Sequence, residues 1–237
     1  MLFGMFQKCI LILINSDKIL KLFRYVCMEI IIPTSLDEIT LAQYRQVEKD
    51  GNDITDELLL KIRVISILCN IPAEEVLKFK AIDLESVYTQ LLQTLSQKPE
   101  LVTSFTLSGV KFGFIPDLDK IGTPEYIDLN EYLEKDPQRA LAVLYRPIVR
   151  ESKELYSIEE YNGTDQYYEL MADAPASAYI SAMVFFYNLG KELLKHIPAY
   201  IQKHLTEAEA THLQQNGVGI SQLMQSLETI ELNIKKF

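Results

Sequence analysis

Three aspartates lie close together in the stretch GFIPDLDKIGTPEYIDL, and they are Asp117, Asp119 and Asp128. Loops rich in carboxylate oxygens bind Ca²⁺ or Mg²⁺, so these residues could serve a metal-dependent enzyme. The loop lacks, however, the fixed frame of ligands around a turn glycine that calcium loops have. Aspartate is also common in turns and helix caps. We therefore expect the aspartates to act as caps, and the metal-dependent enzyme is the alternative function.

The cap interpretation makes two predictions about this stretch. Replacing Asp117 by alanine should cost more stability than activity, and equal thermal stability with a lost metal affinity would contradict this. Arg146, in the sequence LYRP, could pair with one of the aspartates. This pair would fix the aspartate loop against the expected helix over residues 137–146.

Other residues that could do chemistry do not form an active-site pattern. The sequence contains no GxSxG, GxxxxGK[ST], GxGxxG or HExxH motif. His196, His204 and His212 follow one another at eight-residue steps. Such a step turns about 80° around an α-helix, so the three cannot meet one metal from a single helix. Glu125 and Glu131 could form an acid/base pair, but any acidic helix offers such pairs. The sequence therefore favours a protein that is not an enzyme and has no catalytic residue, metal or cofactor.

The net charge of −10 is unfavourable for binding nucleic acid, which requires lysine and arginine to displace counterions from phosphates. It is equally unfavourable for docking on an anionic membrane. Acidic residues are concentrated in the middle of the chain, where residues 117–173 contain 14 acidic and 6 basic residues. Such a region is typical of a solvated face or of a surface that meets a basic partner.

Hydrophobic periodicity predicts several helices in the first part of the chain, over residues 39–53, 55–71, 72–79 and 83–97. Thr40 and Thr55 are the expected N-caps of the first two. Residues 29–32, EIII, are a candidate strand. The period then changes, and residues 103–115 alternate apolar and polar side chains around Ser108-Gly109, which is typical of a β-hairpin.

Helices are expected again in the second part, over residues 124–135, 137–146, 163–175, 176–205 and 219–237. Thr123 is the expected N-cap of the first of these helices. Residues 150–163 are polar and rich in tyrosine, and we expect a loop there. The segment 176–205 is apolar on nearly every face through its middle, which predicts a central buried helix with a kink or break at Pro198.

The expected fold class is α+β, mostly α-helical, with one small β-hairpin near 103–115. We expect an apolar N-terminal extension over residues 1–27, a helical domain with the hairpin over 28–150, and a helical C-terminal region over 151–237. The apolar run CILILI of the extension is followed by polar residues and is too short for a membrane helix. Met28 is an alternative start of translation.

The three cysteines have no CxxC spacing, which disfavours a disulfide framework or a zinc site. Cys69 lies in the apolar run VISILCNI and is expected to pack as a small hydrophobic residue. The aromatic side chains are better suited to contact with another protein than to stacking on nucleic-acid bases. An apolar stripe on the last expected helix is also a way to engage a partner helix. Our candidate interaction residues are Phe114, Asp117, Asp119, Tyr126, Arg146, Phe185, Phe186, Leu223, Leu227 and Ile230.

The run VKFGFIPDLDKIGTPEYIDLNEYL, followed closely by RALAVLYRPI, resembles a family of tailed-phage proteins from phages of gut and marine bacteria, including crAss-like phages. The resemblance covers roughly residues 100–150. The family usually has GEYIDL where this chain has PEYIDL at Pro124, a change that is compatible with a helix start.

A fainter similarity links the stretch IPAEEVLKFKAIDLESVYTQL to tail-assembly chaperones of long-tailed phages. The residues that match the chaperone pattern are Pro72, Glu75, Leu77, Asp83, Leu84 and Val87. The two resemblances imply a non-enzymatic phage protein that binds other phage proteins of the tail, portal or tape-measure type. It would be either a tail-assembly chaperone, acting in the host cytoplasm, or a structural or cargo component that remains in the virion.

Overall fold

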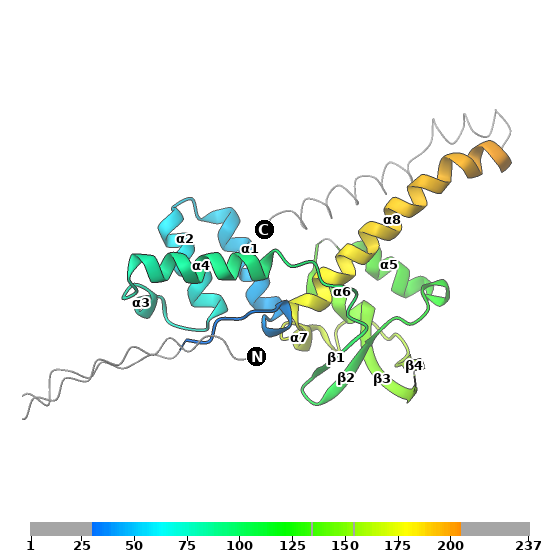
Figure 1. The fold of residues 1–237 in the computed structure, drawn as a ribbon. Coiled ribbons are helices and arrows are strands. Elements are labelled where there is room, and N and C mark those ends of the chain that lie inside the picture. Colours follow the sequence, from blue (N-terminus) through cyan, green and yellow to red (C-terminus); the bar gives the residue numbers. More distant parts are fainter. Residues whose placement is uncertain (1–29, 134, 154, 205–237) are drawn as a thin grey trace, which may run out of the picture. The chain divides into compact units, whose positions relative to one another are not determined.

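The computed structural model describes residues 30–133, 135–153 and 155–204, with side chains as far as Glu192 (Figure 1). The chain divides into two units, Met1–Ile30 and Ile31–Phe237. Everything below concerns the second unit. The apolar extension, the alternative start at Met28, the last expected helix and His212 lie outside the described residues.

The first part of the second unit consists of helices. They are η1 (Leu36–Glu38), α1 (Leu41–Asp53), α2 (Glu57–Leu68), α3 (Ala73–Val76) and α4 (Ala81–Leu95). Thr40 caps α1 as predicted, and forms a reciprocal capping box with Gln43. The cap of α2 is Asp56, whose carboxylate accepts from the Leu59 amide at 2.7 Å, and not Thr55. Of the candidate strand 29–32, residues 30–32 are described and do not form a strand, because no strand of the described residues pairs with them.

The core of this helical part is formed by most of the predicted apolar faces. These faces are Leu58, Ile62, Ile65 and Cys69 along α2 and at its end, and Val87, Leu91 and Leu95 along α4. Leu58 is 59% exposed and Val87 is half-buried, contrary to the prediction. Ile62, Ile65 and Cys69 are buried on α2 and at its end, and Leu91 and Leu95 are buried on α4. Burial raises the pKa of the Cys69 thiol to about 11. Cys69 therefore packs as a small hydrophobic residue, as expected from the sequence.

The second part is built on a four-stranded antiparallel sheet, so the prediction of a single hairpin is incomplete. The strands are β1 (Ser104–Leu107), β2 (Val110–Phe114), β3 (Tyr145–Ser152) and β4 (Leu155–Ile158), in the order β1-β2-β3-β4. The predicted hairpin is β1–β2, with Leu107 opposite Val110. Its two turn residues, Ser108 and Gly109, have φ of 50° and 80°, the left-handed values of a type I′ turn.

The unpredicted strands β3 and β4 occupy residues for which a helix end and a loop were expected. The preceding helix, α6 (Pro137–Leu144), ends before Tyr145, and β3 begins there. Pro147 is tolerated in β3 because it faces Phe112 in a pair that does not share hydrogen bonds with β2. Residue 150, expected as a domain boundary, lies inside β3.

The remaining helices lie beside the sheet (Figure 1). They are η2 (Leu118–Lys120), α5 (Thr123–Tyr132), α6, α7 (Tyr168–Met171) and α8 (Ala176–His204). The cap of α5 is Gly122, one residue before the predicted Thr123. The start of α8, Ala176–Met183, is buried, but residues 184–189 are partly or fully exposed, so the prediction of a helix buried through its middle is only partly right. The helix continues through Pro198 without the predicted break. No helix among those described is long and apolar enough to cross a membrane.

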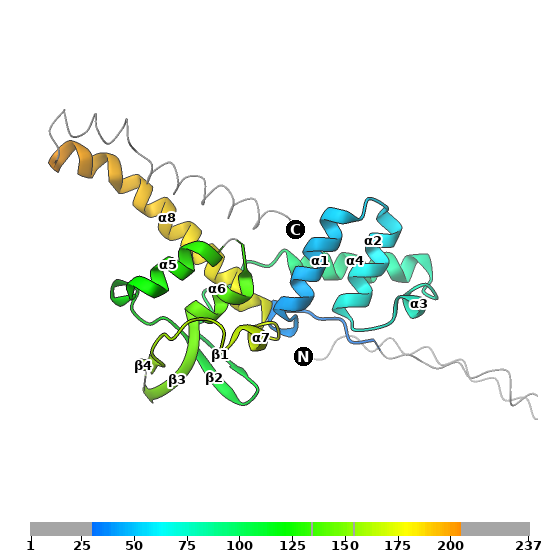
Figure 2. The ribbon, with the colours of Figure 1, turned by 180° about the vertical axis from the view of Figure 1, so that it is seen from behind.

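The helical part and the sheet part are joined by backbone hydrogen bonds between segments far apart in sequence (Figure 2). The amide of Leu41 donates to the carbonyl of Ala174 at 2.8 Å, and the amide of Ala176 donates to the carbonyl of Ile39 at 2.8 Å. The hydroxyl of Ser177, in the first turn of α8, donates to the carboxylate of Asp37. These bonds hold residues 37–42 beside residues 172–177.

Candidate functional site

The first predicted group, Asp117 and Asp119, lies on the exposed loop at η2. The carboxylate of Asp117 accepts from the Asp119 amide at 3.1 Å, which caps η2, and lies 2.7 Å from the Lys120 ammonium. The hydrogen bond from Lys120 is the main cause that holds the pKa of Asp117 below its usual value. The aspartate thus serves as a cap, as expected.

Asp128 does not join this pair. It lies on α5, where its carboxylate accepts a hydrogen bond from the Tyr161 hydroxyl. Among the residues that the structure describes, no group of three or more histidine, cysteine, aspartate or glutamate side chains could hold a metal ion. The three aspartates therefore belong to two separate interactions, the cap of η2 at Asp117 and Asp119 and the hydrogen bond from Tyr161 to Asp128.

Arg146 does form an ion pair, but its partner is Glu125 and not an aspartate. Arg146 Nη2 lies 2.6 Å from Glu125 Oε1, and the two side chains are only 8% and 11% exposed. The second carboxylate oxygen, Glu125 Oε2, accepts from the Gly122 amide at 2.5 Å. The Arg146 guanidinium also lies 5.5 Å from the centre of the Tyr161 ring. We call Glu125, Asp128, Arg146 and Tyr161 the Arg146 cluster.

The Arg146 cluster connects α5, β3 and the segment after β4, with Glu125 and Arg146 buried and Asp128 and Tyr161 partly exposed. Arg146 Nε is buried and has no hydrogen-bond partner among the described residues. Burial, followed by the hydrogen bond to Asp128, raises the pKa of Tyr161. A buried, ion-paired arginine with this many internal contacts positions the elements around it.

The predicted aromatic interaction residues are mostly engaged inside the protein. Phe114 is 5% exposed, and its ring centre lies 5.8 Å from that of Phe185 and 6.4 Å from that of Phe186. Tyr126, on α5, is 61% exposed and remains available for contact. The remaining predicted residues, Leu223, Leu227 and Ile230, lie outside the described residues.

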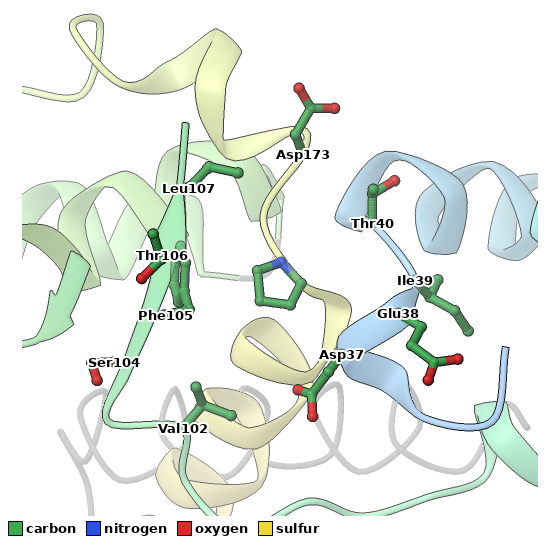
Figure 3. A pocket seen from close by; sticks show the side chains of 11 residues that line it. Asp37, Glu38, Ile39, Thr40, Val102, Ser104, Phe105, Thr106, Leu107 and Asp173 are labelled. Carbon is green, nitrogen blue, oxygen red and sulfur yellow. The ribbon is translucent and has the colours of Figure 1, made fainter. Parts of the chain in front are cut away.

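A groove that the sequence did not predict runs beside β1 (Figure 3). Its volume is about 500 Å³, and it is lined by β1, Val102, residues 37–40, Asp173 and Pro175. We call it the β1 groove. Figure 3 shows β1 along one side, with Asp37, Ile39 and Thr40 on the other side. A volume of this size is within the range of ligand pockets.

The strand that forms this wall has one unpaired edge, because β1 is the first strand of the sheet. The Phe114 amide donates to the Thr103 carbonyl at 2.9 Å. Antiparallel pairs alternate, so Phe105 and Leu107 also direct their peptide groups toward β2, and Ser104 and Thr106 direct theirs away from it. The peptide groups of Ser104 and Thr106 have no hydrogen-bond partner among the described residues.

Three carboxylates line the groove, and none of its lining residues is a lysine or arginine. Asp37 accepts from Ser177, and Glu38 accepts from the Thr34 amide at 2.9 Å. Asp173 is exposed; its amide donates to the Leu170 carbonyl, and its carboxylate has no hydrogen-bond or ion-pair partner within the described part of the chain. The hairpin pattern could have indicated the free strand edge, but no local signal indicated the opposite wall.

Comparison of the chain with protein-family models, curated proteins and solved structures finds no match.

Proposed function

We propose that this chain is a non-enzymatic protein-binding component of tailed-phage assembly, and that it binds its partner in the β1 groove. The observation that carries the proposal is the unpaired edge of β1 at the wall of the groove. Ser104 and Thr106 each offer an amide and a carbonyl there. An exposed strand edge is a template for another polypeptide, since its peptide groups match those of an added strand.

The sequence of β1 strengthens this interpretation. Natural proteins commonly protect an edge strand with lysine, proline or a bulge. The four residues of β1, SFTL, contain none of these, and the pairing of β1 with β2 is regular. Short length is the one protection that β1 has. A groove beside such an edge fits a short segment of a partner protein.

The phage role rests on the resemblance of the run from VKFGFIPDLDKI to AVLYRPI. The partners would be tail, portal or tape-measure proteins. As a tail-assembly chaperone, the chain would act in the host cytoplasm and leave before the particle is complete. As a structural or cargo component, it would remain in the virion.

Site-specific photo-cross-linking tests the proposal. A photoreactive phenylalanine analogue is placed at Thr106 in the full chain during infection, and the cross-linked products are identified by mass spectrometry. We expect a phage structural protein to be cross-linked from Thr106. The same analogue at Val149, which is exposed on β3 and does not line the groove, is the matched control.

Two other results would overturn the proposal. One is a Thr106 variant that supports infection and cross-links nothing beyond the Val149 background. The other is cross-linking only to host metabolic enzymes. Mass spectrometry of purified particles then separates the two versions, because stoichiometric peptides indicate a virion component and their absence indicates a chaperone.

A further inference from the structure

We infer that the segment captured in the β1 groove is an extended, basic strand that pairs with β1. This inference rests on the proposed function and specifies the chemistry of the partner. It follows from the hydrogen-bonding groups of the strand edge, from the side chains beside them, and from the charge of the groove.

The hydrogen-bonding groups require an extended partner. The free amides and carbonyls belong to Ser104 and Thr106, which are two residues apart on one strand edge. Their spacing along the strand is about 7 Å, which is the repeat of a second β-strand. A compact ligand could satisfy one of these peptide units, whereas an added strand satisfies both.

The side chains of β1 give the partner an alternating pattern. Phe105 and Leu107 point to the face of the sheet that holds the buried Phe112, since paired residues share a face. Phe105 already stacks on Phe112, with ring centres 5.8 Å apart. Apolar residues of an added strand would extend this face, and its alternate residues would lie beside Ser104 and Thr106.

The charge of the groove selects a basic partner over a second copy of the chain. Asp37, Glu38 and Asp173 line the groove without any lysine or arginine. The chain as a whole carries a net charge of −10. Pairing β1 with β1 of a second copy would bring the same carboxylates together, and like charges at an interface are unfavourable. Lysine or arginine in the incoming strand would instead complement them.

Peptide binding to the purified full chain tests this inference. The probe is a short fluorescent peptide that alternates lysine and valine, and binding is followed by fluorescence polarisation. We expect saturable binding that weakens as salt is added. A peptide alternating glutamate and valine should not bind. A lysine–valine peptide that is N-methylated at alternate residues, on the edge that meets β1, should also fail, although its charge is unchanged.

Two substitutions locate the binding. Thr106→Pro removes an outward amide and keeps the bonds to β2, and proline is tolerated at a strand edge. It should weaken binding about tenfold, as expected for losing one hydrogen bond. Asp173→Asn should weaken it about threefold. Glu131→Gln, an equal charge change on the exposed surface of α5, should have no effect.

Several outcomes would overturn the inference. Equal binding of the methylated peptide would exclude strand pairing, and this readout does not depend on how the variants fold. Equal binding of the acidic peptide would exclude charge selection. A stable dimer in light scattering that Thr106→Pro dissociates would identify a second copy as the occupant. If Thr106 cross-links a phage protein but the basic peptide does not bind, the proposed function stands and this inference fails.

Discussion

Asp117 and Glu125 lie in the same acidic stretch, yet the structure uses their carboxylates in opposite ways. Asp117 is exposed on the η2 loop, where it caps a turn and meets Lys120. Glu125 is buried against Arg146 and the Gly122 amide. The composition of the stretch is uniform, so the difference arises from burial.

This difference has energetic consequences. An exposed ion pair gains little, because water and salt screen the charges and both side chains lose freedom. In a buried pair, each charge has lost its hydration, and removing one partner leaves the other buried and uncompensated. Substitutions in the Arg146 cluster should therefore have much larger effects on stability than substitutions in the η2 loop.

The largest effect is expected for Arg146→Ala. It leaves the Glu125 carboxylate buried without its counterion, and should lower the free energy of unfolding by about 3–5 kcal/mol. Urea denaturation followed by circular dichroism measures this loss. Arg150→Ala, which removes an exposed arginine from the same strand, is the control and should cost less than about 1 kcal/mol.

A double substitution tests the cause. If an uncompensated charge is responsible, combining Arg146→Met with Glu125→Leu should recover most of the lost stability, since apolar pairs often replace buried ion pairs without penalty. A double variant as unstable as Arg146→Ala would show that packing, and not the buried charge, explains the loss.

The next largest effect is expected for Gly113→Ala, opposite Arg146 in the sheet. A Cβ at Gly113 would lie 2.6 Å from Tyr156 Cε2 and 2.9 Å from Ile148 Cγ1. The Tyr156 ring cannot move freely, because its hydroxyl donates to the Phe114 carbonyl at 2.8 Å. We expect a loss of about 1–3 kcal/mol from overpacking.

Gly51→Ala is the matched control for this prediction. Gly51 lies in α1 with nothing within 4 Å of an added Cβ. Alanine should stabilise the helix there by up to about 1 kcal/mol. Thermal unfolding should therefore show shifts of opposite sign for the two glycines, and two shifts of the same sign would contradict the assigned cause.

A smaller effect is expected for Tyr161→Phe, which removes the hydrogen bond to Asp128 at the edge of the Arg146 cluster. The loss should be about 1 kcal/mol at neutral pH. The pKa of Tyr161 is raised in the folded protein, so the folded state retains this proton when the unfolded state has lost it. The stabilisation is therefore complete below the ordinary tyrosine pKa of about 10, and decreases as the pH rises above it.

Unfolding measured from pH 8 upward checks this dependence. Other tyrosines contribute an alkaline loss of their own, since burial and a hydrogen bond to Glu159 raise the pKa of Tyr167 to about 12. The relevant quantity is thus the difference between the wild-type protein and Tyr161→Phe. That difference should shrink with rising pH, and a constant difference would mean that the hydroxyl proton is not involved.

The smallest effect is expected for Asp117→Ala. Both Asp117 and Lys120 are exposed, so the midpoint of unfolding should shift less than in the three variants above. Because the pKa of Asp117 is lowered in the folded state, its contribution is present at neutral pH and is lost as the pH falls below the ordinary aspartate value. A shift as large as that of Arg146→Ala would remove the distinction between the two regions.

Sequence reasoning was most accurate where neighbouring residues decide the structure. Thr40 was predicted as a helix N-cap and Ser108-Gly109 as a hairpin turn, and both are observed. The predicted caps Thr55 and Thr123, in contrast, each lie one residue from the observed cap. The prediction missed β3 because YRPIVRES contains charges and a proline, which resemble a loop. That segment becomes a strand because β2 and β4 pair with it on both sides.

The sequence by itself therefore determined features made within a few residues. They are the cap at Thr40, the turn at Ser108-Gly109, most of the buried faces of α2 and α4, and the use of Asp117 as a cap. The tertiary structure alone decided the features whose partners are distant. It chose Glu125 for Arg146, and it set residues 37–40 and Pro175 opposite the edge of β1 to form the groove. Periodicity specifies which face of an element is buried, but the element that covers it is selected by packing among segments far apart in the chain.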